Sequence, residues 1–323
     1  MRAIVQEEYG SPEVLRVGEI DRPKVGDGEV LVRVQAAGVD PGVWHLMTGL
    51  PYLVRILGYG LRAPKTRVPG TDCAGRVEAV GKDVTHFQPG DEVFGFCQGC
   101  YAEYACARAD KIVAKPANLD FEQAAAVPTS AITALQGLRD KGEVAAGQKV
   151  LIIGASGGVG TFAVQLAKVF GAEVTGVCST PKMDLVRSIG ADHVVDYTRE
   201  DIAQTGERYD VILDTAGNRS LANLRGALTP RGTLVIVGGE EGGKWLAGTD
   251  RQLRAALLSP LVSQRLRSFV ASARQEDLEF LKGLFESGKV TPVIDRTYPL
   301  AEAPEAIRYL TAGHARGKLV LTV

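Results

Sequence analysis

The sequence lacks several features that would assign it to a nucleic acid, a membrane or an oxidising compartment. Its 37 basic and 38 acidic residues nearly cancel, so the chain lacks the positive field that nucleic-acid binding normally requires. No apolar run is long enough for a transmembrane helix, and the opening MRAIVQEEYG has acids where a secretory signal would be apolar. Five cysteines form an odd set, which argues against a complete disulfide framework. We therefore expect a reduced, cytoplasmic protein with no nucleic-acid or membrane partner.

What the chain does contain is enough residues for two domains, at 323. The first region, residues 1–120, has strand-like segments such as Val30–Ala36 and Gly75–Val80, and glycine and proline interrupt it often. This pattern predicts an antiparallel, barrel-like β unit. The final segments, which end in the strand KLVLTV (318–323), have the same character, so we expect the chain to return to this unit at its end.

The middle of the chain alternates between helical and strand patterns. We expect helices at Gln123–Arg139, Thr161–Phe170 and Glu276–Ser287, and the aliphatic stretch Leu253–Leu266 also has the length of a helix. The short apolar strands between them are KVLIIG (149–154), EVTGVC (173–178), HVVDY (193–197), DVILDTA (210–216) and TLVIVG (233–238). Repeated βαβ units of this kind predict an α/β domain with a parallel sheet.

A glycine-rich turn follows the first of these strands, in KVLIIGASGGVG (149–160). Strand, glycine turn and helix in this order are typical of dinucleotide binding, because the free N–H groups and dipole of the helix start attract a pyrophosphate. A side chain at Gly157 or Gly158 would hold the phosphates away, and one at Gly160 would separate helix from strand. The alternative is a glycine-rich turn with no ligand. The predicted cofactor-binding residues here are Gly154, Ser156, Gly157, Gly158, Val159 and Gly160.

The end of the next strand indicates which dinucleotide is bound. An NAD site usually has an acidic residue here for the ribose 2′-hydroxyl, whereas this chain reads Cys-Ser-Thr-Pro-Lys (178–182). Ser179, Thr180 and Lys182 can donate hydrogen bonds to a 2′-phosphate, which a carboxylate would repel. The alternative is an ordinary helix cap, with Pro181 at the first helical position. We predict NADPH rather than NADH.

Taken together, seven segments resemble the medium-chain dehydrogenase/reductase superfamily, specifically its zinc-free quinone oxidoreductase-like branch. The resemblance covers nearly the whole chain. Its segments are AAGVDP (36–41), VPGTDCAGRVEAVG (68–81), PGDEVFGF (89–96), AEYA (102–105), AAAVPTSAITALQGL (124–138), GASGGVG (154–160) and GKLVLTV (317–323).

The resemblance implies an α/β fold with a Rossmann doubly wound parallel sheet and a GroES-like β-barrel domain, with the active site between them. We expect the GroES-like catalytic domain at 1–120 and 290–323, and the Rossmann NADPH-binding domain at 121–289. The resemblance also implies that Thr133 lies near the nicotinamide, that Tyr197 lies beside the adenosine phosphate, and that Val237, Gly238 and Gly239 border the cofactor. Homodimers or homotetramers are common in this superfamily.

The sequence departs from the zinc-dependent relatives at the positions of their ligands. Asp40 stands where they have a cysteine, and Gly70-Thr71-Asp72 stands where they have Gly-His-Glu. Cys97 and Cys100 form a CxxC pair, but a four-thiolate site needs a second pair, which Cys106 alone cannot supply. We predict no metal site.

Without zinc, hydride addition to a quinone or an α,β-unsaturated carbonyl is the easier reaction, because the resulting anion is delocalised. The catalytic candidates are Asp40, Tyr52 and Thr133. Asp40 could donate to a developing oxyanion only if it is protonated, and its alternative role is a turn residue before Pro41. Tyr52 belongs to the aromatic and aliphatic segment 44–65, which suits an apolar substrate or, alternatively, a packing or dimer-facing loop.

Three functions remain open at this point. The first is an NADPH-dependent reductase of small apolar quinones or enones. The second is a zinc-free alcohol or aldehyde oxidoreductase. The third is an NADPH-binding protein without turnover, such as a crystallin-like or accessory protein.

Overall fold

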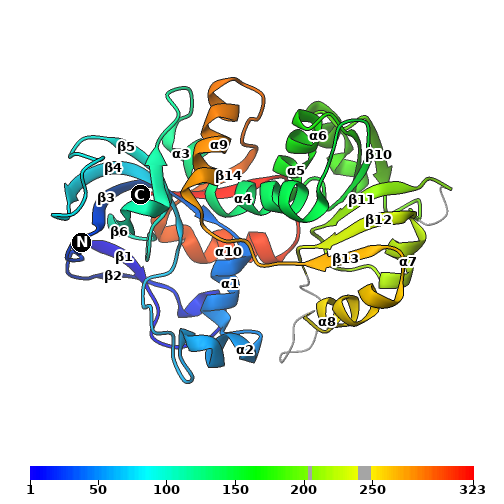
Figure 1. Ribbon diagram of the computed structural model, residues 1–323. Coiled ribbons are helices and arrows are strands. Elements are labelled where there is room, and N and C mark those ends of the chain that lie inside the picture. Colours follow the sequence, from blue (N-terminus) through cyan, green and yellow to red (C-terminus); the bar gives the residue numbers. More distant parts are fainter. Residues whose placement is uncertain (203–205, 239–248) are drawn as a thin grey trace. The chain divides into compact units, whose positions relative to one another are not determined.

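The computed structural model describes residues 1–202, 206–238 and 249–323, which form two compact units (Figure 1). Unit 1 comprises 1–132 and 273–323, and unit 2 comprises 133–272. These bounds differ from the predicted domains, since residues 121–132 and 273–289 belong to unit 1. The reason is packing: helix α3 (Phe121–Ala125) contacts strands of the unit 1 sheet, helix α9 (Gln275–Glu286) contacts β7, and Asn118 donates to the Phe285 carbonyl at 2.8 Å.

Unit 1 is built on a seven-stranded, mostly antiparallel sheet. Only the β14–β15 pair is parallel, and β6 pairs with the long central strand β3 beside the main path. The order along the path is β14 (Ile294–Pro299), β15 (Lys318–Thr322), β3 (Glu29–Val39), β4 (Asp72–Val80), β5 (Glu92–Phe96) and β7 (Ile112–Ala114), with β6 at Tyr104–Arg108. A separate hairpin joins β1 (Arg2–Val5) to β2 (Arg16–Glu19). The strand-rich first region is therefore confirmed.

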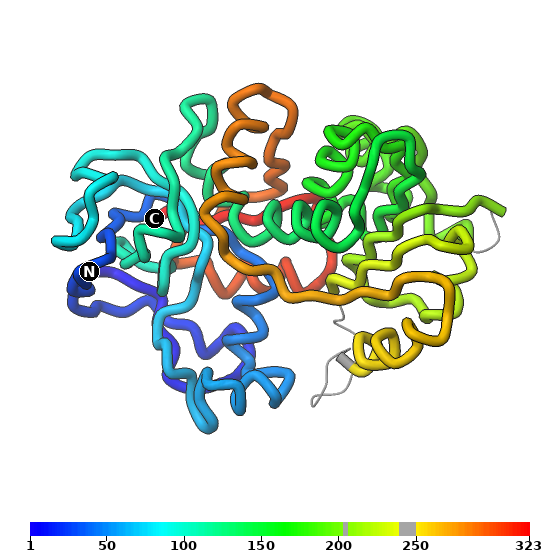
Figure 2. Tube along the Cα trace, viewed as in Figure 1, coloured from blue at the N-terminus to red at the C-terminus, as the bar shows by residue number. Residues whose placement is uncertain are grey.

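The end of the chain completes this sheet, as predicted. Strand β15 pairs antiparallel with β3, with Leu319 opposite Val39, and both chain termini lie in unit 1 (Figure 2). Helix α10 (Ala303–Thr311), which the sequence reading missed, precedes β15 and buries Ala303, Ala306 and Ile307.

The helix predicted at Gln123–Arg139 is divided. Helix α3 ends at Ala125, α4 runs from Pro128 to Gln136, and a π-helical turn follows at Gly137–Gly142. Proline has no N–H to continue a helix, so a new helix starts at Pro128. The other helices of unit 1 are α1 (Pro41–Thr48) and the short α2 (Tyr52–Val54), which continues as a π-helical turn at Arg55–Tyr59.

Unit 2 contains a fully parallel six-stranded sheet in the order β10-β9-β8-β11-β12-β13. The chain builds outward from β8 to β10, returns to the other side of β8, and builds outward again to β13. This is the doubly wound Rossmann arrangement, and its topological switch point lies between β8 and β11. The strands are β8 (Lys149–Ile153), β9 (Glu173–Cys178), β10 (His193–Asp196), β11 (Tyr209–Asp214), β12 (Leu228–Ile236) and β13 (Arg265–Ser268).

The described helices of unit 2 connect these strands (Figure 1). Those between strands are α5 (Gly158–Val169), α6 (Met183–Ser188), α7 (Leu221–Gly226) and α8 (Thr249–Leu258). The single helix considered for Leu253–Leu266 is wrong: α8 ends at Leu258, a 3-10 turn follows at Ser259–Leu261, and β13 begins at Arg265. Among the described residues, no helix has both the length and the apolar character to cross a membrane.

Candidate active site

The glycine-rich turn joins β8 to α5 at the switch point of the unit 2 sheet. Gly157 is the N-cap of α5, and as a glycine it leaves the first turn of the helix without a side-chain cap. The N–H groups of Gly158, Val159 and Gly160 consequently have no partner within the helix. A twelve-residue helix that begins this way presents free donors and the positive end of its dipole to an anion.

Two glycines of this turn are required, one by a close backbone contact and one by its backbone conformation. A Cβ on Gly160 would lie 2.0 Å from the Gly154 carbonyl oxygen, which confirms that a side chain there would force helix and strand apart. Gly154 has φ +80°, and its Cβ would lie 2.5 Å from the Thr215 hydroxyl oxygen. Around Gly157, by contrast, an added Cβ would meet only the Gly154 oxygen, at 3.4 Å. This space beside the helix start fits a pyrophosphate, and Ser156, 6% exposed, lies next to it in the chain.

The neighbouring strands end at the same edge of the sheet. Thr215 follows β11 and donates to the Ile153 carbonyl at the end of β8, while Val237 follows β12 and donates its N–H to the Asp214 carbonyl at 3.0 Å. A Cβ on Gly238 would lie 2.5 Å from the Thr215 carbonyl oxygen. Val237 and Gly238 thus lie at the edge where a dinucleotide binds in this fold. Gly239 is outside the described residues.

The second predicted group, Ser179, Thr180, Lys182 and Tyr197, gathers where β9 and β10 end. Cys178 and Asp196 pair across the two strands, and the N–H of Tyr197 donates to the Cys178 carbonyl at 3.1 Å. Tyr197 is 51% exposed. Ser179 is the N-cap of a short 3-10 turn, Thr180–Lys182, and its side chain makes no capping hydrogen bond, so the helix-cap alternative for this hydroxyl does not hold.

Asp196 is a site residue that the sequence reading missed. The Thr180 hydroxyl donates to Asp196 Oδ2, while the N–H and hydroxyl of Thr198 donate to Oδ1 at 3.0 and 2.7 Å. A hydroxyl has one proton, so the expectation that Thr180 donates to a phosphate is corrected: its proton is used by Asp196. These hydrogen bonds, that of Thr180 first, lower the pKa of Asp196. Only the pairing of β9 with β10, and not the chain order, could reveal this contact.

Asp196 ends β10 next to the end of β9 and would oppose a 2′-phosphate, but a basic side chain lies beside it. Arg199 Nε lies 3.7 Å from Asp196 Oδ2. Burial and the charge of Asp196 raise the pKa of the Cys178 thiol to about 11, and the charges of Lys182 and Arg187 oppose that shift. Arg187 also pairs with Asp184 at 3.0 Å, so Lys182 and Arg199 are the side chains that favour an additional phosphate here.

Asp40, the departure at a zinc-ligand position, lies in unit 1 as the N-cap of α1. Its Oδ1 accepts a 2.7 Å hydrogen bond from the N–H of Gly42, so the turn role considered for it is confirmed. The side chain is 4% exposed, and its second oxygen, Oδ2, is buried without a hydrogen-bond partner among the described residues. Capping of α1 uses only Oδ1 of Asp40, so Oδ2 is available to another hydrogen-bonding group.

Asp72 and Lys318 lie near Asp40 and were not predicted as site residues. Asp72 is fully buried at the start of β4 and accepts from the Thr129 N–H at 2.9 Å and the Thr129 hydroxyl at 2.6 Å. Lys318, 2% exposed at the start of β15, has no hydrogen-bond partner for Nζ within the described part of the chain. Burial and the charge of Asp40 raise the pKa of Asp72 to about 7, against the effects of Lys318 and Thr129.

The other two catalytic candidates have less distinctive surroundings. Thr133 is buried in α4, at 8% exposure, in unit 2. Tyr52 begins α2 in unit 1, where the Arg55 guanidinium lies 4.9 Å from its ring centre and 4.3 Å from that of Tyr9. The segment around Tyr52 exposes several apolar side chains, namely Leu53, Ile56, Leu57, Tyr59 and Leu61.

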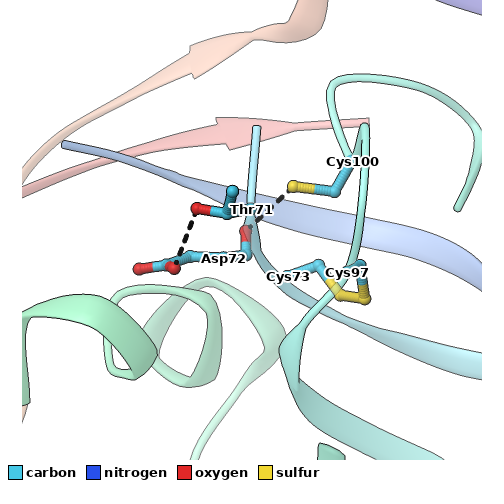
Figure 3. Close-up of a disulfide and its surroundings, with 5 residues drawn as sticks. All are labelled: Thr71, Asp72, Cys73, Cys97 and Cys100. Carbon is cyan, nitrogen blue, oxygen red and sulfur yellow. Dashed lines mark hydrogen bonds between the residues drawn. A yellow bond between two sulfur atoms is a disulfide. The ribbon is translucent and has the colours of Figure 1, made fainter. Parts of the chain in front are cut away.

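The cysteines correct one prediction. Cys73 of β4 and Cys97 after β5 form a disulfide with Cα atoms 6.0 Å apart, so the chain is not fully reduced (Figure 3). The antiparallel β4–β5 pairing, with Cys73 opposite Gly95, brings the two segments together. Cys100, Cys106 and Cys178 are free, and Cys100 Sγ donates to the Asp72 carbonyl at 3.3 Å. Cys97 and Cys100 are thus not a ligand pair, and within the described ranges no three His, Cys, Asp or Glu side chains form a group that could hold a metal.

Unit 2 has a Rossmann sheet with an uncapped glycine turn at its switch point, and the same chain builds a mostly antiparallel sheet in unit 1. Together these two features define a dinucleotide-dependent oxidoreductase. The family model for alcohol dehydrogenase GroES-like domains matches residues 26–117, and that for zinc-binding dehydrogenases matches residues 189–321. The chain belongs to the medium-chain dehydrogenase/reductase superfamily, in its quinone oxidoreductase-like branch.

Three similar proteins illustrate this membership. The chloroplastic NADPH-dependent alkenal/one oxidoreductase of Arabidopsis thaliana is 34% identical, over 99% of this chain and 79% of its own length. The quinone oxidoreductase structure from Coxiella burnetii is 30% identical with a TM-score of 0.86, covering 100% of this chain and 99% of that one. The Escherichia coli quinone oxidoreductase complexed with NADPH is 26% identical with a TM-score of 0.86, covering both chains completely.

Proposed function

We propose that this protein is a zinc-independent, NADPH-dependent oxidoreductase that transfers hydride to a small apolar quinone or α,β-unsaturated carbonyl. The observation that carries the proposal is the uncapped start of α5 at the switch point of the parallel sheet, with Lys182 after β9 and Arg199 after β10. The similarity to NADPH-dependent alkenal/one and quinone oxidoreductases supports both the cofactor and the kind of acceptor.

The chain's own residues suit both the pyrophosphate and the 2′-phosphate of NADPH. The N–H groups of Gly158, Val159 and Gly160 would hold the pyrophosphate, because they are the donors that α5 leaves unused. Lys182, with Ser179 and the exposed ring of Tyr197, would bind the 2′-phosphate and adenosine. Val237 and Gly238, which follow the central strand β12, would border the nicotinamide half together with Thr133.

When bound, NADPH supplies a hydride to the acceptor. The protein must then orient the acceptor and provide one proton, because reduction of a quinone or an enone adds a hydride and a proton. Asp40 is our candidate for handling that proton, since its buried Oδ2 has no partner among the described residues. Tyr52 is our candidate for a hydrogen bond to the acceptor carbonyl, on a segment whose exposed aliphatic side chains suit an apolar molecule.

Zinc independence is part of the proposal and rests on residue chemistry. Asp40 and Thr71 stand where zinc-dependent relatives have cysteine and histidine. Asp40 already uses one oxygen as the cap of α1, and Thr71 uses its hydroxyl toward Asp72 at 3.4 Å. A neutral hydroxyl is a poor replacement for an imidazole ligand of Zn²⁺.

The experiment measures NADPH consumption with a panel of quinones, enones, aldehydes and ketones, with and without a strong zinc chelator. We expect turnover with quinones or enones that the chelator leaves unchanged. Turnover confined to aldehydes or alcohols would support a zinc-free alcohol or aldehyde oxidoreductase instead. Tight NADPH binding without turnover of any acceptor would identify a non-catalytic NADPH-binding protein, and loss of activity with the chelator would contradict zinc independence.

We further propose that the enzyme is a homodimer or homotetramer. Leu253, Leu257 and Leu261, at helical spacing on α8 and the turn after it, are 62%, 67% and 80% exposed, and β13 is an edge strand of its sheet. Exposed leucines in one row are costly in a monomer and suit a subunit contact. Light scattering coupled to size exclusion tests this, with Leu257→Glu as the variant expected to shift the mass toward the monomer.

A further inference from the structure

Unit 1 buries three charged side chains close to one another: Asp72, Lys318 and Asp40, at 0%, 2% and 4% exposure. We call them the buried charge cluster. Removing a charge from water costs free energy unless partners compensate it. Stability alone therefore gives little reason to bury these three groups together. Their hydrogen bonds distinguish the carboxyl oxygen that can take up a proton from those that cannot do so freely.

The strand ladders explain how residues so distant in the sequence meet. In the β3–β15 ladder Leu319 lies opposite Val39, so Lys318 is level with the next residue of the chain, Asp40. In the β3–β4 ladder Ala37 lies opposite Cys73, which puts Asp72 level with Gly38. A Cβ on Gly38 would lie 2.6 Å from the Ala125 carbonyl oxygen and 3.0 Å from Asp72 Cβ, so glycine is needed there for the close approach.

Hydrogen bonds distinguish the two carboxyl groups. Both oxygens of Asp72 accept, Oδ1 from the Thr129 hydroxyl and Oδ2 from the Thr129 N–H. Asp40 Oδ1 accepts from Gly42, whereas Asp40 Oδ2 and Lys318 Nζ are buried without a hydrogen-bond partner in the described part of the chain. Both oxygens of Asp72 are therefore already used as hydrogen-bond acceptors. Asp40 Oδ2 accepts no hydrogen bond among the described residues, so a proton can bind there without displacing a donor.

Burial and the charge of a neighbour raise the pKa of Asp72 toward neutral pH. The pKa of Asp72 is about 7 because burial and the Asp40 charge raise it more than Lys318 and Thr129 lower it. The other titratable groups here are Cys100 and Tyr101, and burial raises the pKa of each well above its usual value, so both are neutral at pH 7. Helices α4 and α3 contribute uncharged groups here, Thr129 and the Ala125 carbonyl. Because the two carboxyls interact, the charge of one changes how readily the other takes up a proton.

We propose that Asp40 and Asp72 share one proton, that Asp40 Oδ2 donates it to the reduced substrate, and that Asp72 and Lys318 are positioning residues that keep the proton available on Asp40. The inference rests on the proposed function, because it supplies the proton that reduction of a quinone or enone consumes. Lys318 limits the charge that remains after donation: the cluster passes from neutral, with one proton shared, to a net charge of −1.

The step balances in atoms and electrons. Hydride transfer adds two electrons and one proton to the acceptor and leaves an anion, a hydroquinone monoanion or an enolate. The Oδ2–H bond of Asp40 breaks, its electron pair stays on the carboxylate, and the proton forms an O–H bond on the hydroquinone or a C–H or O–H bond on the enolate. A solvent proton then restores the pair, and no further oxidant or reductant is needed.

The first test uses protein without cofactor or substrate, so it is independent of the proposed function. NMR of aspartate carboxyl carbons, assigned with Asp40→Asn and Asp72→Asn, should show a titration within about one unit of pH 7. Asp40→Asn should lower the midpoint that remains on Asp72, because the neighbouring like charge is gone. Lys318→Met, which keeps the length and removes the charge, should raise the midpoint by about one unit or more, and Lys318→Arg should restore it. Asp277→Asn, a buried carboxyl in α9 outside the cluster, is the matched control and should change nothing.

The second test measures kcat against pH with the best acceptor from the panel. A shared proton donor predicts that kcat falls as pH rises above the midpoint of the pair, that the fall moves up in Lys318→Met, and that Lys318→Arg reverses the shift. KM should change little, because these residues act on the proton and not on binding. Aspartate carboxyls that all titrate below about pH 5 would overturn the proposal, as would a kcat profile that Lys318→Met leaves in place. Absence of wild-type turnover with every acceptor would instead refute the proposed function.

Discussion

The cofactor edge of unit 2 and the buried charge cluster of unit 1 are built in opposite ways. The cofactor edge is largely local: one run of twelve residues, 149–160, forms the strand, the turn and the uncapped helix start. The charge cluster is assembled from residues 40, 72 and 318, which only the ladders of β3 with β4 and β15 bring together. The cofactor edge offers backbone N–H groups that do not titrate, whereas the cluster contains Asp72, whose raised pKa makes its charge depend on pH near neutrality.

This difference suggests a division of labour. Backbone N–H groups at a helix start can bind a phosphate in the same way at every pH at which the protein remains folded. Buried carboxyls beside a lysine can store and release a proton near neutrality. The four predictions below would break or sharpen this comparison, and they run from the largest expected effect to the smallest.

Gly160→Val should abolish the cofactor edge. Its Cβ would lie 2.0 Å from the Gly154 oxygen, so α5 must move away from β8, and we expect a loss of NADPH affinity on the order of 1,000-fold, about 4 kcal/mol. Isothermal titration calorimetry measures it. Gly226→Ala in α7, where an added Cβ meets no atom within 4 Å, is the control and should bind normally. Normal binding by the valine variant would show that this turn does not set the cofactor site.

Asp72→Asn should change how stability depends on pH. The pKa of Asp72 is raised from 3.8 to about 7 in the folded state, so between these values the folded chain holds more protons than the unfolded chain, and this group makes stability fall as pH rises. The contribution has a slope of up to about 1.4 kcal/mol per pH unit, or roughly 3 kcal/mol over about two units. Asparagine cannot ionise, so urea unfolding should show a flatter profile from pH 5 to 7 than wild type. Parallel profiles would mean that Asp72 is ionised throughout.

Lys182→Ala should separate NADPH from NADH. The loss of a charge-assisted hydrogen bond to the 2′-phosphate should weaken NADPH binding by roughly 1–3 kcal/mol and leave NADH nearly unchanged. Competitive calorimetry with both nucleotides measures the difference. Lys149→Ala is the matched control, because Lys149 starts β8 at the opposite end of the sheet and pairs with Glu207 at 2.9 Å. Equal loss for both nucleotides would remove Lys182 from the phosphate site.

Thr180→Val should have the smallest effect on cofactor choice. The Thr180 hydroxyl proton is used by Asp196, so its loss should alter the NADPH-to-NADH affinity ratio by less than about threefold, well below the effect of a direct phosphate donor. The variant should also raise the pKa of Asp196, because its first stabilising hydrogen bond is lost. A loss of NADPH preference as large as that of Lys182→Ala would restore Thr180 as a phosphate donor.

The same contrast explains what the sequence could predict. The glycine turn, the parallel strands and the return of KLVLTV to the first unit follow from local patterns, and the structure confirms them. The unit bounds at 132 and 272, the contact of Thr180 with Asp196 and the Cys73–Cys97 disulfide depend on which strands and helices pack together. From the sequence, Lys318 is predicted only to begin the final strand. No neighbouring residue in the chain indicates that it is buried beside two aspartates.

The central claim is that an adenosine cofactor with a 2′-phosphate binds where β8 passes into α5 and where β9 ends. Calorimetric titration of the folded wild-type protein with NADPH, NADH and adenosine 2′,5′-bisphosphate tests it most directly. The account predicts heat on binding NADPH, weaker binding of NADH, and displacement of NADPH by the bisphosphate, which carries the 2′-phosphate without the nicotinamide. Equal affinity for NADPH and NADH, or no heat with either, would contradict it.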